Sequence, residues 1–158
     1  MSLVLSATDT FVTTAPPAAM WAALANPRRW PDVLTDLREG LIEPPGNLRE
    51  GAVIRTFARP GTSAVDMAYH VVLAEPERRL SFRSEGKDWR GATDYTIEAA
   101  LPTRVTLKIS IEPIGFWPRL SVRIWRRAYQ EQIASNASPR MLAMLRLAET
   151  IAREGAHA

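Results

Sequence analysis

The chain has 158 residues, of which 46% are hydrophobic, 23% are charged and none is cysteine, so disulfide bonds and thiolate metal sites are excluded. At this length roughly 70% of the unfolded chain's surface can be buried, enough for one core with a cavity inside it. The 20 basic and 17 acidic side chains are interspersed and give a net charge of only +3, whereas nucleic-acid-binding proteins concentrate Lys and Arg on one surface, so we expect no nucleic-acid partner.

The N-terminal residues 1–6 lack the basic flank and the long apolar stretch of a secretion signal. No apolar run in the sequence approaches the ~20 residues that a membrane-spanning helix needs. We therefore expect a soluble cytoplasmic protein.

Two short helices are predicted to follow an opening strand over residues 3–14. The prolines at positions 16 and 17 suit the first turn of a helix, and apolar residues then recur at helical spacing until Asn26-Pro27, where this helix should end. A second helical turn over residues 28–30 is expected to end at Pro31, because proline disfavours helix in the residue before it.

Six short β runs bounded by proline and glycine come next. They cover residues 37–43, 52–59, 64–74, 79–84, 89–99 and 104–112. The connections between them are too short to carry crossover helices, so neighbouring strands should pair as an antiparallel meander. Several runs alternate apolar and polar residues, which predicts one buried face for each of them.

A long amphipathic helix is predicted from Gly115 to the end of the chain, with a break at Ser138-Pro139. At about 100° per residue, Trp117 and Trp125 fall on one side and most of the neighbouring arginines fall on the other. We expect the aromatic side to pack against the sheet and the arginines to be the solvated face. The less favoured alternative is a basic amphipathic helix that lies on an anionic membrane.

A family resemblance is carried by motifs at the first helices, at one strand corner and at the start of the last strand. These motifs are Ala15-Pro16, Met20-Trp21, Leu24, Asn26-Pro27 and Trp30-Pro31, the run over residues 73–82, and the run over residues 103–107. With them the chain resembles the START-like or SRPBCC superfamily, and within it the polyketide cyclase/dehydrase branch. The resemblance covers residues 1–158 as one domain.

This resemblance implies an α+β helix-grip fold, in which a curved seven-stranded antiparallel sheet wraps around a long C-terminal helix. Two short helices lie between the first and second strands of such a fold. Between sheet and helix, superfamily members hold a hydrophobic cavity for lipids, sterols, polyketides and similar molecules. A sheet that curls around one helix has difficulty filling the space near its open end, so a cavity there is also physically reasonable.

The resemblance therefore implies a protein that binds a small hydrophobic ligand such as a lipid or polyketide. The alternative is a polyketide cyclase- or dehydratase-like enzyme that acts on a poly-carbonyl substrate in the same cavity. The sequence leaves open whether any reaction is catalysed and whether the protein is a monomer or a homodimer. We expect no cofactor.

Aromatic and hydroxyl side chains on inward-facing positions are the candidate ligand contacts. Tyr69 and Tyr95 lead, because a phenol can donate a hydrogen bond to a carbonyl without being a strong base. The full candidate set is Tyr69, Tyr95, Thr93, Trp89, Phe82, Ser121, Trp125 and Arg55. The alternative is that the aromatic rings fill the core and that the hydroxyls hydrogen-bond to one another or to backbone carbonyls.

The place of Arg55 in this set depends on the phase of the strand over residues 52–59. Val53 and Phe57 share a face with Arg55, while Ile54 and Thr56 share the other face. An inward Arg55 would suit a carboxylate or an enolate on the ligand. The alternative is an edge-proximal strand whose arginines and two apolar residues face solvent.

Conventional catalytic groups are scarce, and we assign no catalytic residue. Of the two histidines, His157 lies in the C-terminal tail, and His70 falls with Asp66 on the outward face of its strand. A register shift or a β-bulge would turn both inward as an acid–base pair. With so few histidines and no cysteine, we expect no metal site.

Overall fold

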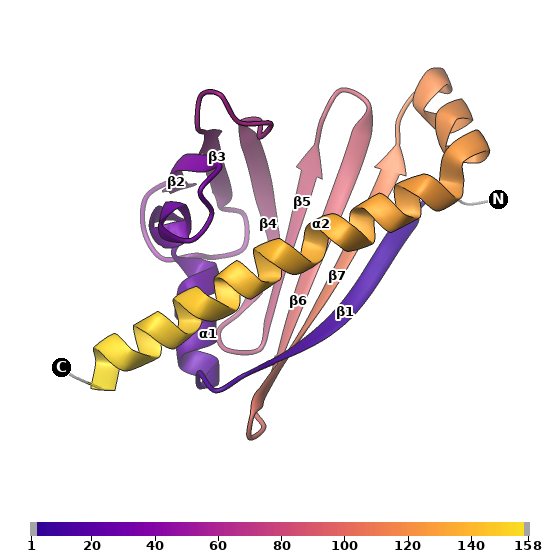
Figure 1. Ribbon diagram of the computed structural model, residues 1–158. Coiled ribbons are helices and arrows are strands. Elements are labelled where there is room, and N and C mark those ends of the chain that lie inside the picture. Colours follow the sequence, from indigo (N-terminus) through magenta and orange to yellow (C-terminus); the bar gives the residue numbers. More distant parts are fainter. Residues whose placement is uncertain (1–2, 157–158) are drawn as a thin grey trace.

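A curved seven-stranded antiparallel sheet holds one long helix across its concave face (Figure 1). The structure is a computed structural model that describes residues 3–156. In chain order its elements are β1 (Leu5–Thr13), α1 (Pro17–Ala25), the 3₁₀-helix η1 (Pro27–Asp32), β2 (Leu37–Glu43), β3 (Val53–Ala58), β4 (Met67–Glu75), β5 (Arg79–Glu85), β6 (Trp89–Glu98), β7 (Thr103–Pro113) and α2 (Phe116–Ala156). The predicted α+β helix-grip architecture is confirmed.

The strands lie in the order β1-β7-β6-β5-β4-β3-β2. From β2 to β7 each strand pairs with its neighbour in sequence, as the short connections require. The first strand pairs with the last, from Leu5 opposite Ile111 to Thr13 opposite Thr103. The edges of the sheet are therefore β1 and β2, and the connection between these two strands carries α1 and η1.

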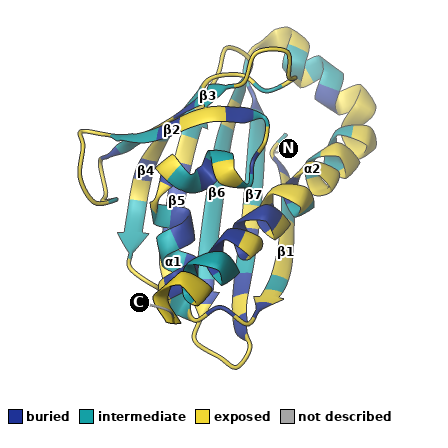
Figure 2. Cartoon of the chain, turned by 60° about the vertical axis from the view of Figure 1, so that its left-hand side comes forward, coloured by how far each residue is buried: buried dark blue, intermediate teal, exposed yellow. Residues whose placement is uncertain are grey.

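The hydrophobic core lies where α2 crosses the sheet next to α1 (Figure 1). Met141 and Leu147 of α2 are buried there with Met20 and Leu24 of α1 and with Leu80 of β5. Figure 2 shows the same division along α2, which has buried residues in its second half and mostly exposed residues in its first turns. No helix within residues 3–156 is both long and apolar enough to cross a membrane.

The break in the long helix lies at Trp125, where the backbone leaves helical geometry (φ −113°, ψ 26°). The predicted break at Ser138-Pro139 is wrong, because α2 continues through Pro139. A proline removes one backbone donor, and the carbonyl of Ser135 that loses this donor belongs to an exposed residue and can bond to water. The flanking Ala137 and Met141 are buried in the core, and their packing holds the helix against the sheet on both sides of Pro139.

The bend at Trp125 also overturns the expected orientation of the preceding turns. Trp117 and Trp125 are exposed, and the fully buried residue of this segment is Val122. The expectation that the aromatic side packs against the sheet is therefore wrong. That expectation assumed one straight helix, whereas the bend turns residues 116–124 away from the axis of the rest of α2 (Figure 1).

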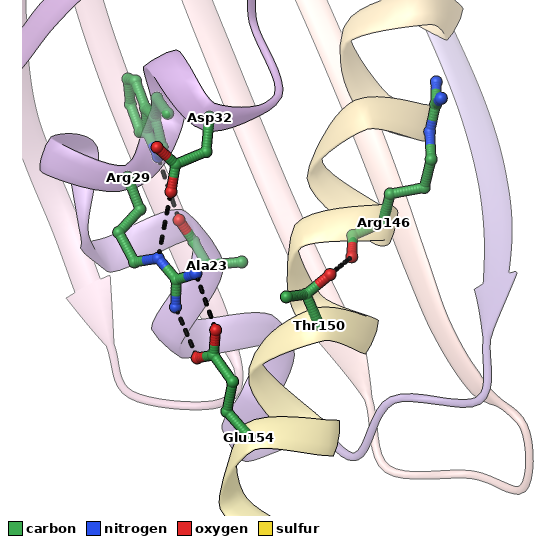
Figure 3. A network of polar contacts seen from close by, with 7 residues as sticks. Ala23, Arg29, Asp32, Arg146, Thr150 and Glu154 are labelled. Atoms are coloured by element: carbon green, nitrogen blue, oxygen red, sulfur yellow. Dashed lines mark hydrogen bonds and ion pairs between the residues drawn. The ribbon is translucent and has the colours of Figure 1, made fainter.

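The helix η1 is joined to both α1 and the C-terminal turns of α2 (Figure 3). Nη1 and Nη2 of Arg29 donate to the Glu154 carboxylate at 2.7 and 3.0 Å, and this hydrogen bond lowers the pKa of Glu154. Nε1 of Trp30 donates to the carbonyl of Ala23 in α1 at 3.0 Å. The ion pair is exposed and contributes little stability, whereas the indole of Trp30 is buried and joins η1 to α1. The helix continues through Pro31 because its i→i+3 bonds, from Arg29 to Asn26 and from Val33 to Trp30, do not use the proline nitrogen.

Gly40 of β2 permits close packing between the sheet edge and η1. A Cβ at this position would lie 2.3 Å from the carbonyl oxygen of Pro27, which is far inside van der Waals contact with a backbone atom. Side chains other than hydrogen are therefore excluded here by contact rather than by backbone conformation.

We predict that Gly40→Ala lowers the free energy of unfolding by about 1–3 kcal/mol, because β2 and η1 must separate to accommodate the methyl group. Chemical denaturation monitored by circular dichroism measures this loss. The matched control is Gly155→Ala, where a Cβ meets no atom within 4 Å and where alanine is the better helix former. Equal stability of the two variants would contradict the packing argument.

Candidate functional site

A cavity of about 260 Å³ lies between the concave face of the sheet and α2. Its walls come from α1, η1 and the residues that follow it, from the strands of the sheet, and from the middle of α2. The lining residues are Leu24, Trp30, Leu34, Leu37, Thr56, Tyr69, Phe82, Thr93, Tyr95, Leu107, Ile109, Ile111, Ile133, Asn136, Ala137, Arg140 and Met144. The lining is thus mainly apolar, with a small group of polar side chains.

Three aromatic rings form a row across the sheet side of the cavity. Strand pairing places β4, β5 and β6 next to one another, and the ring of Phe82 in β5 lies 5.9 Å from the rings of both Tyr69 in β4 and Tyr95 in β6. Thr93, opposite Phe82, shares its strand face with Tyr95. The row therefore brings two phenols and a threonine hydroxyl to one wall.

The two phenols are hydrogen-bond donors at neutral pH. Burial raises the pKa of Tyr95, with a smaller contribution from its neighbour Tyr69. Burial also raises the pKa of Tyr69, although the positive charge of Arg140 and a hydrogen bond with Thr56 act in the opposite direction. Both side chains keep their protons under ordinary conditions, so they can donate to a ligand oxygen but do not act as bases.

Arg140 of α2 lies at the edge of the cavity. Among the lining residues that the structure describes, it is the one with a charged side chain. Its Nη2 donates to Oδ2 of Asp36 at 2.6 Å, which bridges α2 and the connection between η1 and β2. A second hollow, of about 480 Å³, lies outside this ion pair and shares Leu34, Asn136 and Arg140 with the cavity. Arg140 therefore stands between an inner and an outer hollow.

Four of the eight candidate residues come together in the cavity lining. These are Tyr69, Tyr95, Thr93 and Phe82. Regular alternation along β4, β5 and β6 was sufficient to place these four residues on the inner face. Their contact with a ligand stays a prediction.

Trp89, Ser121 and Trp125 lie outside the cavity lining, at or near the bend of α2. The ring of Trp89 packs 5.6 Å from that of Tyr129, the hydroxyl of Ser121 lies 2.8 Å from the Tyr129 hydroxyl, and Trp125 is exposed. The prediction that these three side chains line the cavity is wrong. The bend at Trp125 directs this part of α2 away from the cavity, so Ser121 and Trp89 contact the helix after the bend instead.

Arg55 also lies outside the cavity. Its side chain is exposed, and its Nε donates to Oε2 of Glu43 on the adjacent strand β2 at 2.5 Å. Ile54 and Thr56 are the buried residues of β3, so the outward phase is the correct one. The outer face includes Phe57, which is half-buried under the guanidinium of Arg38 at 5.5 Å, and this contact explains why the hydrophobic pattern of β3 was ambiguous.

Asn136 and Arg140, the polar residues that α2 contributes to the cavity, were not predicted from the sequence. A signal was present, because Arg140 precedes the buried Met144 by four residues and so shares its helical face. Charged residues on an apolar stripe are usually discounted as solvent-facing, and Arg140 is here half exposed at the cavity edge.

His70 is exposed, as predicted, and Asp66 accepts a hydrogen bond from the backbone N–H of Ala58 at 2.8 Å. A register shift does occur in β4, but it falls between Val71 and Leu73, beyond His70, and leaves the histidine facing outward. The other histidine, His157, lies outside the described residues. Within residues 3–156, no group of three or more histidine or carboxylate side chains is arranged to hold a metal ion.

Residues 5–137 match the family model described as "Polyketide cyclase / dehydrase and lipid transport". The chain belongs to this family. The match covers most of the sequence and confirms the resemblance to the START-like superfamily. A comparison of this family member with curated proteins found no match.

Solved structures share the fold of this family member at low sequence identity. The di-domain ARO/CYC BexL from the BE-7585A biosynthetic pathway is 16% identical, with a TM-score of 0.71 over 95% of this chain and 50% of BexL. Ara h 8.0201 is 12% identical, with a TM-score of 0.72 over 93% of this chain and 99% of its own. TTHA0849 from Thermus thermophilus is 15% identical, with a TM-score of 0.68 over 93% and 97%. The chain spans only half the length of BexL, and these likenesses show the fold alone.

We predict that the buried phenol of Tyr95 makes the stability of the protein fall at alkaline pH. The unfolded phenol ionises near its ordinary pKa of 10, whereas the folded pKa is higher, so stability is fully present below pH 10 and is lost as the pH rises beyond it. Denaturation of wild type and Tyr95→Phe from neutral pH to about pH 11 should show the steeper loss in wild type. Parallel stability curves would contradict the burial of this phenol.

Proposed function

We propose that this protein binds a small hydrophobic molecule that carries at least one polar oxygen, with its apolar body in the cavity between the sheet and α2. The observation that carries the proposal is the composition of the lining, in which two protonated phenols and one guanidinium interrupt an otherwise mostly apolar wall. Such convergence of a few polar groups in an apolar cavity is typical of small-molecule sites. The family description, which includes lipid transport, agrees with a role in binding.

The size of the cavity limits the ligand. An engineered apolar cavity of about 150 Å³ accommodates benzene, so the roughly 260 Å³ available here suits one or two fused rings or a short acyl chain. The outer hollow beyond Arg140 offers further room for a larger molecule.

The polar groups favour an oxygen-bearing ligand over a pure hydrocarbon. A buried donor without a hydrogen-bond partner costs about 1–3 kcal/mol. A carbonyl or hydroxyl oxygen on the ligand can accept from the phenol of Tyr95, which a hydrocarbon cannot do. An anionic group is further favoured near Arg140, because a guanidinium binds carboxylates through paired hydrogen bonds.

A cyclase-like activity on a poly-carbonyl substrate is the second candidate. It is favoured by the family description and by the proximity of Arg140 to the two phenols, since a phenol can polarise a carbonyl and a cation can stabilise an enolate. Ring closure also requires a group that removes a proton from an acidic methylene. Within the described part of the chain, the lining residues include no carboxylate and no imidazole, so binding is the better supported function.

We predict that wild type takes up the neutral fluorescent probe N-phenylnaphthylamine and releases it to competing ligands. Naphthol and naphthoate should compete about tenfold better than naphthalene, because each supplies an oxygen to the phenols or to Arg140. Tyr95→Phe should reduce the preference for naphthol, and Arg140→Met should reduce the preference for naphthoate. An enzyme would instead lose turnover of a poly-carbonyl substrate in Tyr95→Phe or Tyr69→Phe.

A cavity-filling pair of variants tests the location of this site. Ala137→Phe places a ring in the cavity and should abolish probe uptake, whereas Leu142→Phe adds a ring at an exposed position of the same helix and should leave uptake unchanged. Circular dichroism establishes that both variants are folded. Wild type that takes up no probe, or Ala137→Phe that binds as wild type does, would refute the proposal.

A further inference from the structure

The first turns of α2 expose a cluster of large apolar side chains. We call residues 116–127 the α2 tip. Phe116, Trp117, Ile124 and Trp125 are 72%, 75%, 62% and 63% exposed. Single exposed apolar residues are common on protein surfaces, but a contiguous apolar patch usually marks an interaction site.

The outward orientation of the α2 tip is held by specific contacts. The fully buried Val122 anchors the inner side of the segment, and Nε of Arg119 donates to the carbonyl of Pro113 at 3.4 Å. The Ser121 hydroxyl bonds to Tyr129 across the bend at 2.8 Å. The rings of Phe116 and Trp117 contact each other edge to face, with centroids 5.3 Å apart. The exposed apolar side chains therefore belong to a segment that is fixed to the rest of the protein.

The α2 tip is also strongly basic. Between Glu112 and Glu131 the sequence contains four arginines, at positions 119, 123, 126 and 127, and no carboxylate. All four belong to exposed residues. Arg127 forms an ion pair with Glu131 at 3.2 Å, in which both side chains are largely exposed. The apolar cluster is thus flanked by positive charge.

We propose that the α2 tip docks onto an anionic lipid surface. Exposed tryptophans beside arginines are typical of helices that lie at the membrane interface, where indole rings sit at the headgroup level and arginines pair with anionic headgroups. A second copy of this chain is a poor partner, because it would bring an equal number of arginines against this surface.

The shape of the α2 tip favours a membrane over an acidic protein. In Figure 1 these turns project beyond the ends of the neighbouring strands, so the segment that carries the exposed apolar residues is a protrusion. A protrusion can enter a fluid headgroup layer directly, whereas a protein partner would need a groove of complementary shape. This docking does not depend on what the cavity binds.

Cosedimentation with lipid vesicles tests the inference on the full chain. Wild type should bind vesicles of equal parts phosphatidylcholine and phosphatidylglycerol, should bind pure phosphatidylcholine far more weakly, and should dissociate as salt is raised. Neutralising two arginines in Arg123→Gln/Arg127→Gln, neither of which holds the tip in place, should lower the partition coefficient about 30-fold. Removing two indoles in Trp117→Ser/Trp125→Ser should lower it at least about tenfold.

The matched control is Leu101→Ser/Arg104→Gln. These two exposed residues belong to the β6–β7 connection and the start of β7, at the opposite end of the sheet (Figure 1), and their replacement should leave vesicle binding unchanged. N-phenylnaphthylamine uptake should be equal in all variants, which separates failure of docking from failure of the cavity.

Three results would overturn the inference. The first is wild type that binds anionic and neutral vesicles equally or not at all, and the second is a pair of tip variants that bind as wild type does. The third is a tip-dependent dimer seen by sedimentation velocity without lipid, which would assign the surface to a second copy.

Discussion

The structure depends on one constraint, which is that a single helix must cover the concave face of a strongly curved sheet. A helix with its side chains is about 10 Å across, so it can contact such a sheet closely over only part of its length. In this protein the close contact lies around Met141 and Leu147, where α1 adds a third layer. Nearer the N-terminal end of α2, towards Ile133, the helix and the sheet are farther apart, and the cavity lies between them.

The positions of the polar groups follow from that geometry. Tyr69 and Tyr95 belong to central strands and reach the cavity from the sheet side, where burial keeps the phenols protonated. Arg140 belongs to the helix side and stays partly in water, where Asp36 neutralises it. A neutral donor is thus placed where charge would be costly, and the charge is placed where solvent compensates it.

The strands were predictable because their alternation and short connections leave few other arrangements, and regular alternation was enough to place Tyr95 on the inner face. The orientation of Trp117 and Trp125 was not predictable in this way. A helical phase calculation assumes one straight axis. The non-helical backbone at Trp125 changes the direction of that axis, so the faces before and after this residue no longer coincide. The phase of Arg55 depended on a tertiary contact, because Phe57 on the outer face is covered by Arg38. Arg140 was overlooked because charge alone does not distinguish a cavity edge from open solvent.

The shared position of Arg140 between the inner and outer hollows has a consequence for selectivity. On the sheet side of the cavity, a ligand meets the packed rings of Tyr69, Phe82 and Tyr95. On the α2 side it meets a guanidinium that already binds Asp36. A ligand group that extends towards α2 and bears a negative charge would therefore compete with Asp36 for the same arginine.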